Sequence, residues 1–226
     1  MTALLAAGEP LVRWDWVGRH LDDIWSRVVE HVELTVIAVA IGFVISLPVA
    51  IYAQRHRKAY PPVTFVAGLL YTIPSLALFV MLLPFTGLTT LTAEIGLVSY
   101  TLLILIRNIV AGLDAVPEDA KDAATGMGYT SGQLLWRVEL PLAIPTIVAG
   151  LRIATVTTVG LVTVTALIGK GGLGRFILNG LQIFFPTPTV IGSVLSVALA
   201  LSFDALLLGT GKLLAPWASG RTRGAV

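Results

Sequence analysis

Long stretches of this chain carry no charged side chain, and they limit its possible folds more than any other feature. Residues 34–54, 59–93 and 176–203 contain no Asp, Glu, Lys or Arg. An α-helix rises ~1.5 Å per residue, so about 20 apolar residues cross the hydrocarbon core of a membrane. Only 12% of the residues are charged, against about 25% in a soluble domain. The composition predicts an integral membrane protein and excludes both a soluble globular domain and a disordered chain.

The apolar runs predict an all-α, polytopic membrane protein with five transmembrane helices. The expected spans are about 34–54, 62–84, 90–111, 143–168 and 188–212. Together they form a transmembrane domain over residues 34–212, between an N-terminal segment of residues 1–33 and a cytoplasmic tail of residues 213–226. Pro48 and Pro74 fall within expected spans, where proline kinks a helix.

The N-terminal segment predicts a helix that lies along the membrane surface. Within residues 13–33, Leu21, Ile24 and Val28 recur at helical spacing and mark one apolar face. The tryptophans of this stretch are Trp14, Trp16 and Trp25. Indole rings prefer the headgroup level, which favours the surface helix over the alternative of a frayed polar tail. Residues 1–10 lack the basic start and the long apolar run of a secretory signal.

The basic residues in the loops and near the span ends predict the orientation, because cytoplasmic loops carry an excess of Lys and Arg. In a five-span arrangement, nine of these residues fall on the side of the C-terminus and five on the side of the N-terminus. We therefore expect the N-terminus outside the cell and the C-terminus in the cytoplasm. The net charge of +2 is small, and basic loops account for it without nucleic-acid binding.

The longest expected cytoplasmic connection, residues 112–141, carries signals for two short helices. Pro117 and the two acids after it suit a helix start, and glycines at 126 and 128 would end that helix. For the second helix, Thr130 and Gln133 form a capping box. Pro141 is expected to end this second helix and lead into the fourth span.

The spacing of residues in this connection resembles the EAA loop of type I ABC importer permeases. The family pattern is Glu-Ala-Ala, three residues, Gly, nine residues and Ile-x-Leu-Pro. The matching residues here are Asp122, Ala123, Ala124, Gly128, Val138, Leu140 and Pro141. The spacing is fully kept, with Asp in place of Glu and Val in place of Ile.

The resemblance implies a coupling helix that docks into a groove on a cytoplasmic ATPase. The candidate coupling residues are Glu118, Asp119, Asp122, Ala123, Ala124, Gly128, Leu140 and Pro141. Small alanines would let the helix seat closely, and a glycine at 128 permits a tight turn. The alternative for the same residues is an ordinary amphipathic linker.

Three further segments resemble permeases for osmoprotectants such as glycine betaine, choline and carnitine. These segments are residues 30–51, 72–88 and 166–181. The resemblance implies a permease subunit in a prokaryotic cell (inner) membrane, with a second permease subunit, cytoplasmic ABC ATPases and an extracytoplasmic substrate-binding protein as partners, and with membrane lipid around it. No aromatic cage for a quaternary amine is evident in the spans.

Other functions remain as alternatives at this point. A permease for methionine or another small nutrient has a similar size. A secondary transporter usually shows internal repeats and broken helices around a midplane site, and no repeat is evident. A membrane-embedded enzyme needs a catalytic cluster, which is missing.

We expect no cofactor, metal or catalytic site. The chain has no cysteine, and its three histidines are dispersed, whereas a metal site needs clustered ligands. The sequence Gly209-Thr210-Gly211-Lys212 fails as a P-loop, because Leu206 replaces the first glycine and Leu213 follows the lysine. ATP hydrolysis is therefore expected in a partner subunit.

Two charges fall well inside the expected spans, away from the span ends, where charge is costly and often functional. Arg152 and Asp204 lie at similar depth, counted from the cytoplasmic ends of the fourth and fifth spans. We expect them to pair, directly or through water. In the alternative, Arg152 extends to the interface and Asp204 faces the translocation path.

Small residues mark two further features. Residues at every fourth position form stripes in three spans, for example Ala38, Gly42, Ser46 and Ala50; such stripes allow close helix packing, within the bundle or across a dimer. The glycines that follow the fourth span are Gly169, Gly171, Gly172 and Gly174. They predict a tight outer turn, whose flexibility could serve the docking of a binding protein.

Overall fold

A computed structural model describes residues 10–217, and within them it contains helices and turns and no strand. The helices are α2 (Trp14–Arg19), α3 (Leu21–Arg55), the 3-10 helix η1 (Arg57–Ala59), α4 (Tyr60–Thr72), α5 (Ser75–Thr86), α6 (Thr90–Asp114), α7 (Glu118–Gly126), α8 (Ser131–Leu134), the π-helix η2 (Leu135–Glu139), α9 (Leu140–Val164), the 3-10 helix η3 (Thr165–Ile168), α10 (Gly174–Gln182) and α11 (Pro186–Leu214). The expectations for residues 1–9 and for most of the cytoplasmic tail lie outside the described residues.

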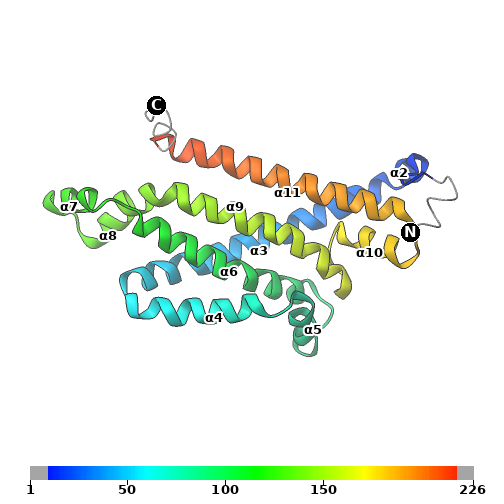
Figure 1. Cartoon of the computed structure of the whole chain (residues 1–226), viewed down its shortest axis with the longest axis horizontal. Coiled ribbons are helices and arrows are strands. Elements are labelled where there is room, and N and C mark those ends of the chain that lie inside the picture. The colour runs from blue at the N-terminus through cyan, green and yellow to red at the C-terminus, as the bar shows by residue number, and fades with distance from the viewer. Residues whose placement is uncertain (1–9, 218–226) are drawn as a thin grey trace.

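The long helices run side by side as an elongated bundle (Figure 1). Among residues 10–217, four helices are long and apolar enough to cross a membrane, and a fifth crossing follows if the bent pair α4–α5 counts as one span. The helices α7 and α8 and the end of α11 lie at one end of the bundle, and α2 and α10 lie at the other. This arrangement agrees with the expected all-α polytopic class.

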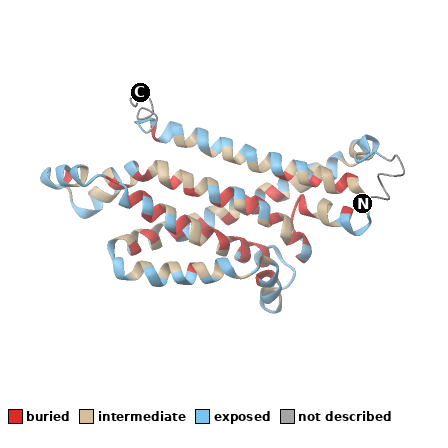
Figure 2. Ribbon diagram, in the orientation of Figure 1, coloured by how far each residue is buried: buried red, intermediate tan, exposed pale blue. Residues whose placement is uncertain are grey.

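The buried residues follow the facing sides of α3, α6 and α9, as Figure 2 shows. In contrast, α11 is mostly exposed along its outer length, and Leu201 and Leu206 are examples of its exposed apolar side chains. Exposed apolar helix surface of this length suits a hydrocarbon environment, because lipid tails solvate leucine as well as a protein core does.

The second expected span, residues 62–84, is not a single straight helix. It divides into α4 and α5, whose axes differ by 94°. The break falls at Pro74, which lacks an N–H and forces the preceding residue out of the helical region; Ile73 accordingly has φ −63° and ψ 127°. The hydroxyl of Tyr100 donates a hydrogen bond to the carbonyl of Ile73. Pro48, by contrast, lies inside α3, which continues unbroken to Arg55.

The expected surface helix over residues 13–33 is wrong in its extent. Residues 21–33 belong to α3 and continue directly into the first span, so only the short α2 stands apart. This helix is attached to the start of α11: the Trp16 ring lies edge-on to Phe185 at 6.0 Å, and the Arg13 N–H donates to Thr187 Oγ1 at 3.0 Å. Tertiary contacts therefore fix α2 in place.

The small-residue stripes pack inside the bundle. Gly42 on α3 faces α6, and a Cβ atom there would lie 1.9 Å from Thr101 Oγ1. On the other side of α6, a Cβ atom at Gly150 of α9 would lie 2.4 Å from Asn108 Cβ. The central helix α6 is thus held closely between α3 and α9, where only glycine leaves room. The stripes could pack within the bundle or across a dimer. The contacts at Gly42 and Gly150 support packing within the bundle.

Candidate functional site

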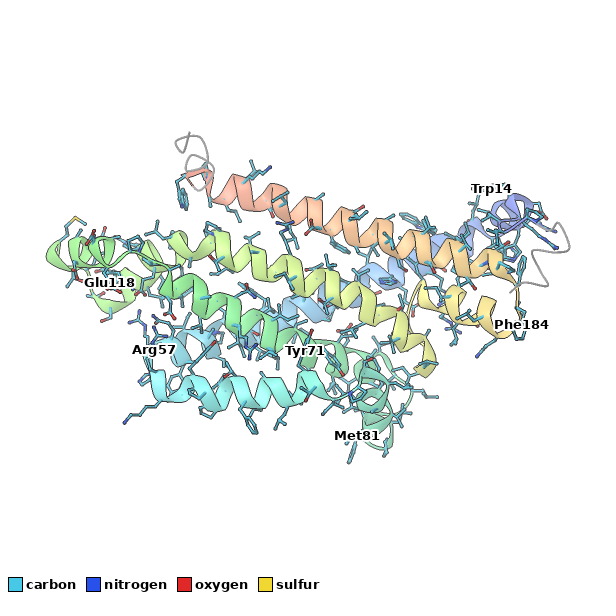
Figure 3. The ribbon with its side chains drawn as sticks, in the orientation of Figure 1. Trp14, Arg57, Tyr71, Met81, Glu118 and Phe184 are labelled. Atoms are coloured by element: carbon cyan, nitrogen blue, oxygen red, sulfur yellow. The ribbon has the colours of Figure 1, made fainter. Side chains whose placement is uncertain are left out.

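The helix α7 projects from one end of the bundle, beyond the ends of the long helices (Figure 1). Pro117 caps its start and two acids occupy its first turn, where they complement the positive end of the helix dipole. Lys121 Nζ lies 2.9 Å from Glu118 Oε1. Glu118, at the tip of the bundle in Figure 3, is 79% exposed at its side chain.

The turn after α7 depends on glycine. Gly128 has φ 84°, in the left-handed region that costs an L-residue about 1–2 kcal/mol. The N–H of Tyr129 donates to the carbonyl of Ala124 at 3.1 Å, which satisfies one of the carbonyl groups left free at a helix end. The helix ends at Gly126, where the glycines predicted its end.

The two alanines of the loop have different surroundings. Ala124 is buried against its own chain, with 1% exposure, whereas Ala123 is exposed. The interpretation that both alanines seat in a partner groove is therefore wrong for Ala124. The surface that α7 offers consists of the exposed residues Glu118, Asp119, Asp122, Ala123 and Met127, which we call the coupling surface. Asp119, Ala123 and Met127 lie four residues apart and share one side of the helix.

The segment after the turn connects the loop rigidly to the fourth span. Thr130 and Gln133 form the expected capping box, with Gln133 Oε1 accepting from the Thr130 N–H at 2.9 Å. Pro141 does not end the second helix, because the chain stays helical from Ser131 to Ile168. The π-helix η2 precedes the proline, which falls in the first turn of α9, where its missing N–H is tolerated. Leu140 lies beside it at the start of α9.

A partly buried ion pair ties this segment to the first span. Arg55, the last residue of α3, has its Nη2 atom 3.0 Å from Glu139 Oε2. The side chain of Glu139 is only 8% exposed, so its charge depends on this partner. Sequence reasoning missed the pair, although Glu139 is the one acidic residue of the second loop helix.

A second ion pair joins the adjacent ends of the first and third spans. Arg57 donates two hydrogen bonds to Asp114, at 2.8 and 2.6 Å, and Gln54 Nε2 donates a third at 3.2 Å. Asp114 follows the expected span 90–111. Burial acts to raise the pKa of its carboxyl, but the hydrogen bonds from Arg57 and Gln54 and the charge of Arg57 outweigh burial and lower that pKa.

The two charges expected inside the spans do pair. Arg152 Nε and Nη2 each lie 2.8 Å from one oxygen of Asp204, in a bidentate arrangement between α9 and α11. About a third of each side chain is exposed. The alternative, in which Arg152 extends alone to the interface, does not match this geometry.

The glycines form the expected tight turn, but the turn is buried rather than open at the surface. Gly171, Gly172 and Gly174 are all buried, and the first two have positive φ angles of 106° and 47°. A Cβ atom at Gly172 would lie 2.7 Å from the carbonyl oxygen of Arg27 on α3. A Cβ atom at Gly174 would lie 2.3 Å from the carbonyl oxygen of Thr163. The turn therefore packs closely against both α3 and the end of α9.

His31 takes part in the same packing. Its side chain is fully buried, and Nε2 lies 3.0 Å from the carbonyl oxygen of Val159 on α9. No local signal could reveal this contact, because its two residues are 128 positions apart.

Within residues 10–217, no group of three or more His, Asp or Glu side chains is placed to hold a metal ion. The sequence from Gly209 to Lys212 is part of the continuous helix α11. It therefore forms no loop that could surround a phosphate.

Comparison with known proteins places most of the chain in a transport context. A family model described as binding-protein-dependent transport system inner membrane component matches residues 32–209. The osmoprotectant import permease protein OsmW of Salmonella typhimurium is 35% identical over 187 residues, covering 80% of this chain and 87% of that protein. The choline transport system permease protein OpuBB of Bacillus subtilis is 31% identical over 194 residues, covering 86% of this chain and 89% of that protein.

A solved structure shares the fold. An inward-facing conformation of the MetNI methionine ABC transporter superposes with a TM-score of 0.73 at 25% identity. The match covers 86% of this chain and 95% of that chain.

Proposed function

Because this chain belongs to the family of inner membrane components of binding-protein-dependent transport systems, we propose that it is the permease subunit of an ATP-driven importer for osmoprotectants. The observation that carries the proposal is the match over residues 32–209 together with the sequence relatives. One of these relatives is named as an osmoprotectant import permease and the other as a choline transport permease. The proposed substrates are small molecules with a quaternary ammonium group, such as glycine betaine, choline or carnitine.

The family implies two kinds of partner, an ATPase and a substrate-binding protein. We assign the ATPase contact to the coupling surface of α7. Its exposed acids, one exposed alanine and Met127 make a small, partly apolar protrusion, and such a protrusion suits a groove on another subunit. The ATPase would supply the nucleotide chemistry, and this chain would supply the moving helices.

The path of motion from the ATPase to the bilayer follows from the loop's attachments. Movement of α7 would act on the helical stretch from Ser131 to Ile168, which is continuous. It would also act on α3 through the Arg55–Glu139 ion pair. A stiff helix and a partly buried ion pair transmit displacement better than a flexible linker does.

The proposed orientation puts the α7 end in the cytoplasm. Arg55, Arg57, Lys58, Lys121 and Lys212 lie at or near this end of the helices, as expected for the cytoplasmic side. The opposite end, with α2, α10 and the outer glycine turn, would face the substrate-binding protein. A second permease subunit, identical or paralogous, would complete the pathway.

A methionine importer is the second candidate, and the MetNI structure favours it. That likeness rests on fold at 25% identity, whereas the osmoprotectant relatives reach 31–35% identity. The osmoprotectant assignment is therefore preferred.

Reconstitution tests the proposal. The permease, its ATPase and the binding protein are placed in proteoliposomes, and uptake of radiolabelled glycine betaine, choline, carnitine and methionine is followed with and without ATP. We expect uptake of a quaternary amine that requires ATP and the binding protein. ATP-dependent uptake of methionine alone would refute the substrate class, and flux driven by an ion gradient without ATP would refute the importer itself.

A further inference from the structure

A groove of about 400 Å³ lies between α3, α4 and α6. Its walls include Ile45 and Val49 from α3, Val66 from α4, and Leu102 and Ile106 from α6. Every side chain that lines it is aliphatic or proline. Ile45 and Val66 are exposed, so the groove opens sideways onto the surface that faces lipid.

The dimensions of the groove suit a thin occupant. Its α4 wall runs from Pro62 to Leu70, a length of about 12 Å at ~1.5 Å per residue. A volume of about 400 Å³ beside this wall leaves room for a slender aliphatic group such as one acyl chain, and the aliphatic walls match the chemistry of that group.

A positive charge stands at one end of the groove. Lys58 lies in the 3-10 helix η1, which leads directly into α4 four residues before the groove residue Pro62. Lys58 is exposed and has no ion-pair partner among residues 10–217, whereas the adjacent Arg57 is bound to Asp114. Its ammonium group is therefore available to an anion at this end of α4.

The α3 wall continues into an aromatic rim at the same end. Ile45, Val49, Tyr52 and His56 recur at helical spacing, so that the two rings lie above the aliphatic part of this wall. Tyr52 is 57% exposed, and its ring stacks with that of His56 at a centroid distance of 4.5 Å. Tyrosine prefers the headgroup level of a membrane.

From this arrangement we propose that the groove binds an anionic phospholipid of the cytoplasmic leaflet. One acyl chain lies between α3, α4 and α6, and the phosphate of the headgroup contacts Lys58. The apolar walls, the aromatic rim and the unpaired lysine follow one another in the same order as the parts of a phospholipid. Basic positions beside grooves between spanning helices are a known means of binding acidic headgroups. The leaflet follows from the orientation proposed above, but the site itself does not depend on the transported substrate.

The test is native mass spectrometry of the purified permease–ATPase complex with added lipid. We expect phosphatidylglycerol to remain bound to the permease and to bind more tightly than phosphatidylcholine of the same chain length. Lys58→Gln should weaken phosphatidylglycerol binding about fivefold, the effect of one lysine near a membrane surface, and leave phosphatidylcholine binding unchanged. Lys212→Gln is the control for charge, since Lys212 lies at the same end of the molecule on α11.

A second variant tests the acyl-chain part of the site. Val66→Trp should fill the groove and remove both lipids, whereas Leu201→Trp on the exposed side of α11 should remove neither. Equal phosphatidylglycerol binding by wild type, Lys58→Gln and Val66→Trp would overturn the proposal. A Val66→Trp variant that keeps its lipid but loses association with the second permease would also overturn it, because the groove would then be a protein interface. If the complex loses transport but binds lipid normally, that result counts against the proposed function and leaves the lipid site standing.

Discussion

Neutralising one partner of the Arg152–Asp204 pair leaves the other charge alone on a membrane-spanning helix. Arg152 lies twelve residues after the start of α9, or about 18 Å along the axis. The hydrocarbon core is ~30 Å thick, so the pair lies near its middle. The expected outcome therefore differs from that of a surface ion pair, which contributes only ~0–1 kcal/mol.

The magnitude follows from the depth of the pair. A lone Arg or Asp at the centre of a spanning helix costs about 2.5–3.5 kcal/mol on insertion scales. Extension of the remaining side chain toward the interface recovers part of this cost. We expect Arg152→Gln and Asp204→Asn each to lower the free energy of unfolding by about 2 kcal/mol. The double variant should lose no more than either single variant, because two neutral amides leave no unpaired charge.

The assay is a double-mutant cycle on the free energy of unfolding, measured by denaturant titration in mixed micelles and followed by tryptophan fluorescence. The expected coupling energy is about 2 kcal/mol. A charge swap, Arg152→Asp with Asp204→Arg, should recover part of the stability and assembly lost by either reversal alone. Additive losses in the double variant, with coupling below about 0.5 kcal/mol, would refute the role assigned to the pair.

Three further results are expected from the close contacts. Gly42→Val should destabilise the bundle by about 1–3 kcal/mol through overpacking on α6, while Gly68→Ala, which has open space around its Cβ position, should be neutral; thermal unfolding measures both. Gly128→Ala should cost about 1 kcal/mol at its positive φ and weaken ATPase binding in a pull-down titration, whereas the same change at Gly126 should not. The pKa of Asp114 is lowered in the folded protein, so its carboxylate should stabilise the fold above its ordinary pKa near 4. This stabilisation should disappear as the pH falls further. The difference in stability between wild type and Asp114→Asn, measured at pH 7, 5 and 3, should therefore become smaller toward pH 3.

Local chemistry predicted much of the loop between the third and fourth spans. The start of α7 at Pro117, its end at the glycines and the Thr130–Gln133 capping box all depend on neighbouring residues, so sequence alone is sufficient for them. The pairing of Arg152 with Asp204 was also accessible, because few charges occur in the spans and each needs a partner.

Contacts between distant segments account for the errors. A proline in an apolar run predicts a kink, but the 94° bend at Pro74 also involves the hydrogen bond from Tyr100. An apolar face and three tryptophans before the first span suggested a separate surface helix, yet His31 and Gly172 pack this stretch into the bundle. The Arg55–Glu139 pair joins residues 84 positions apart, beyond the reach of any local pattern.

The most direct test of the account is disulfide crosslinking between α7 and the ATPase. The natural chain has no cysteine, so Ala123→Cys introduces a single thiol on the coupling surface, and Leu181→Cys introduces an exposed control at the other end of the molecule. The account predicts that Ala123→Cys crosslinks to a cysteine in the ATPase groove and resists an impermeant thiol reagent added to whole cells, while Leu181→Cys reacts with that reagent and forms no crosslink. Labelling of Ala123→Cys from outside the cell, or no crosslink in an assembled and active complex, would contradict the account.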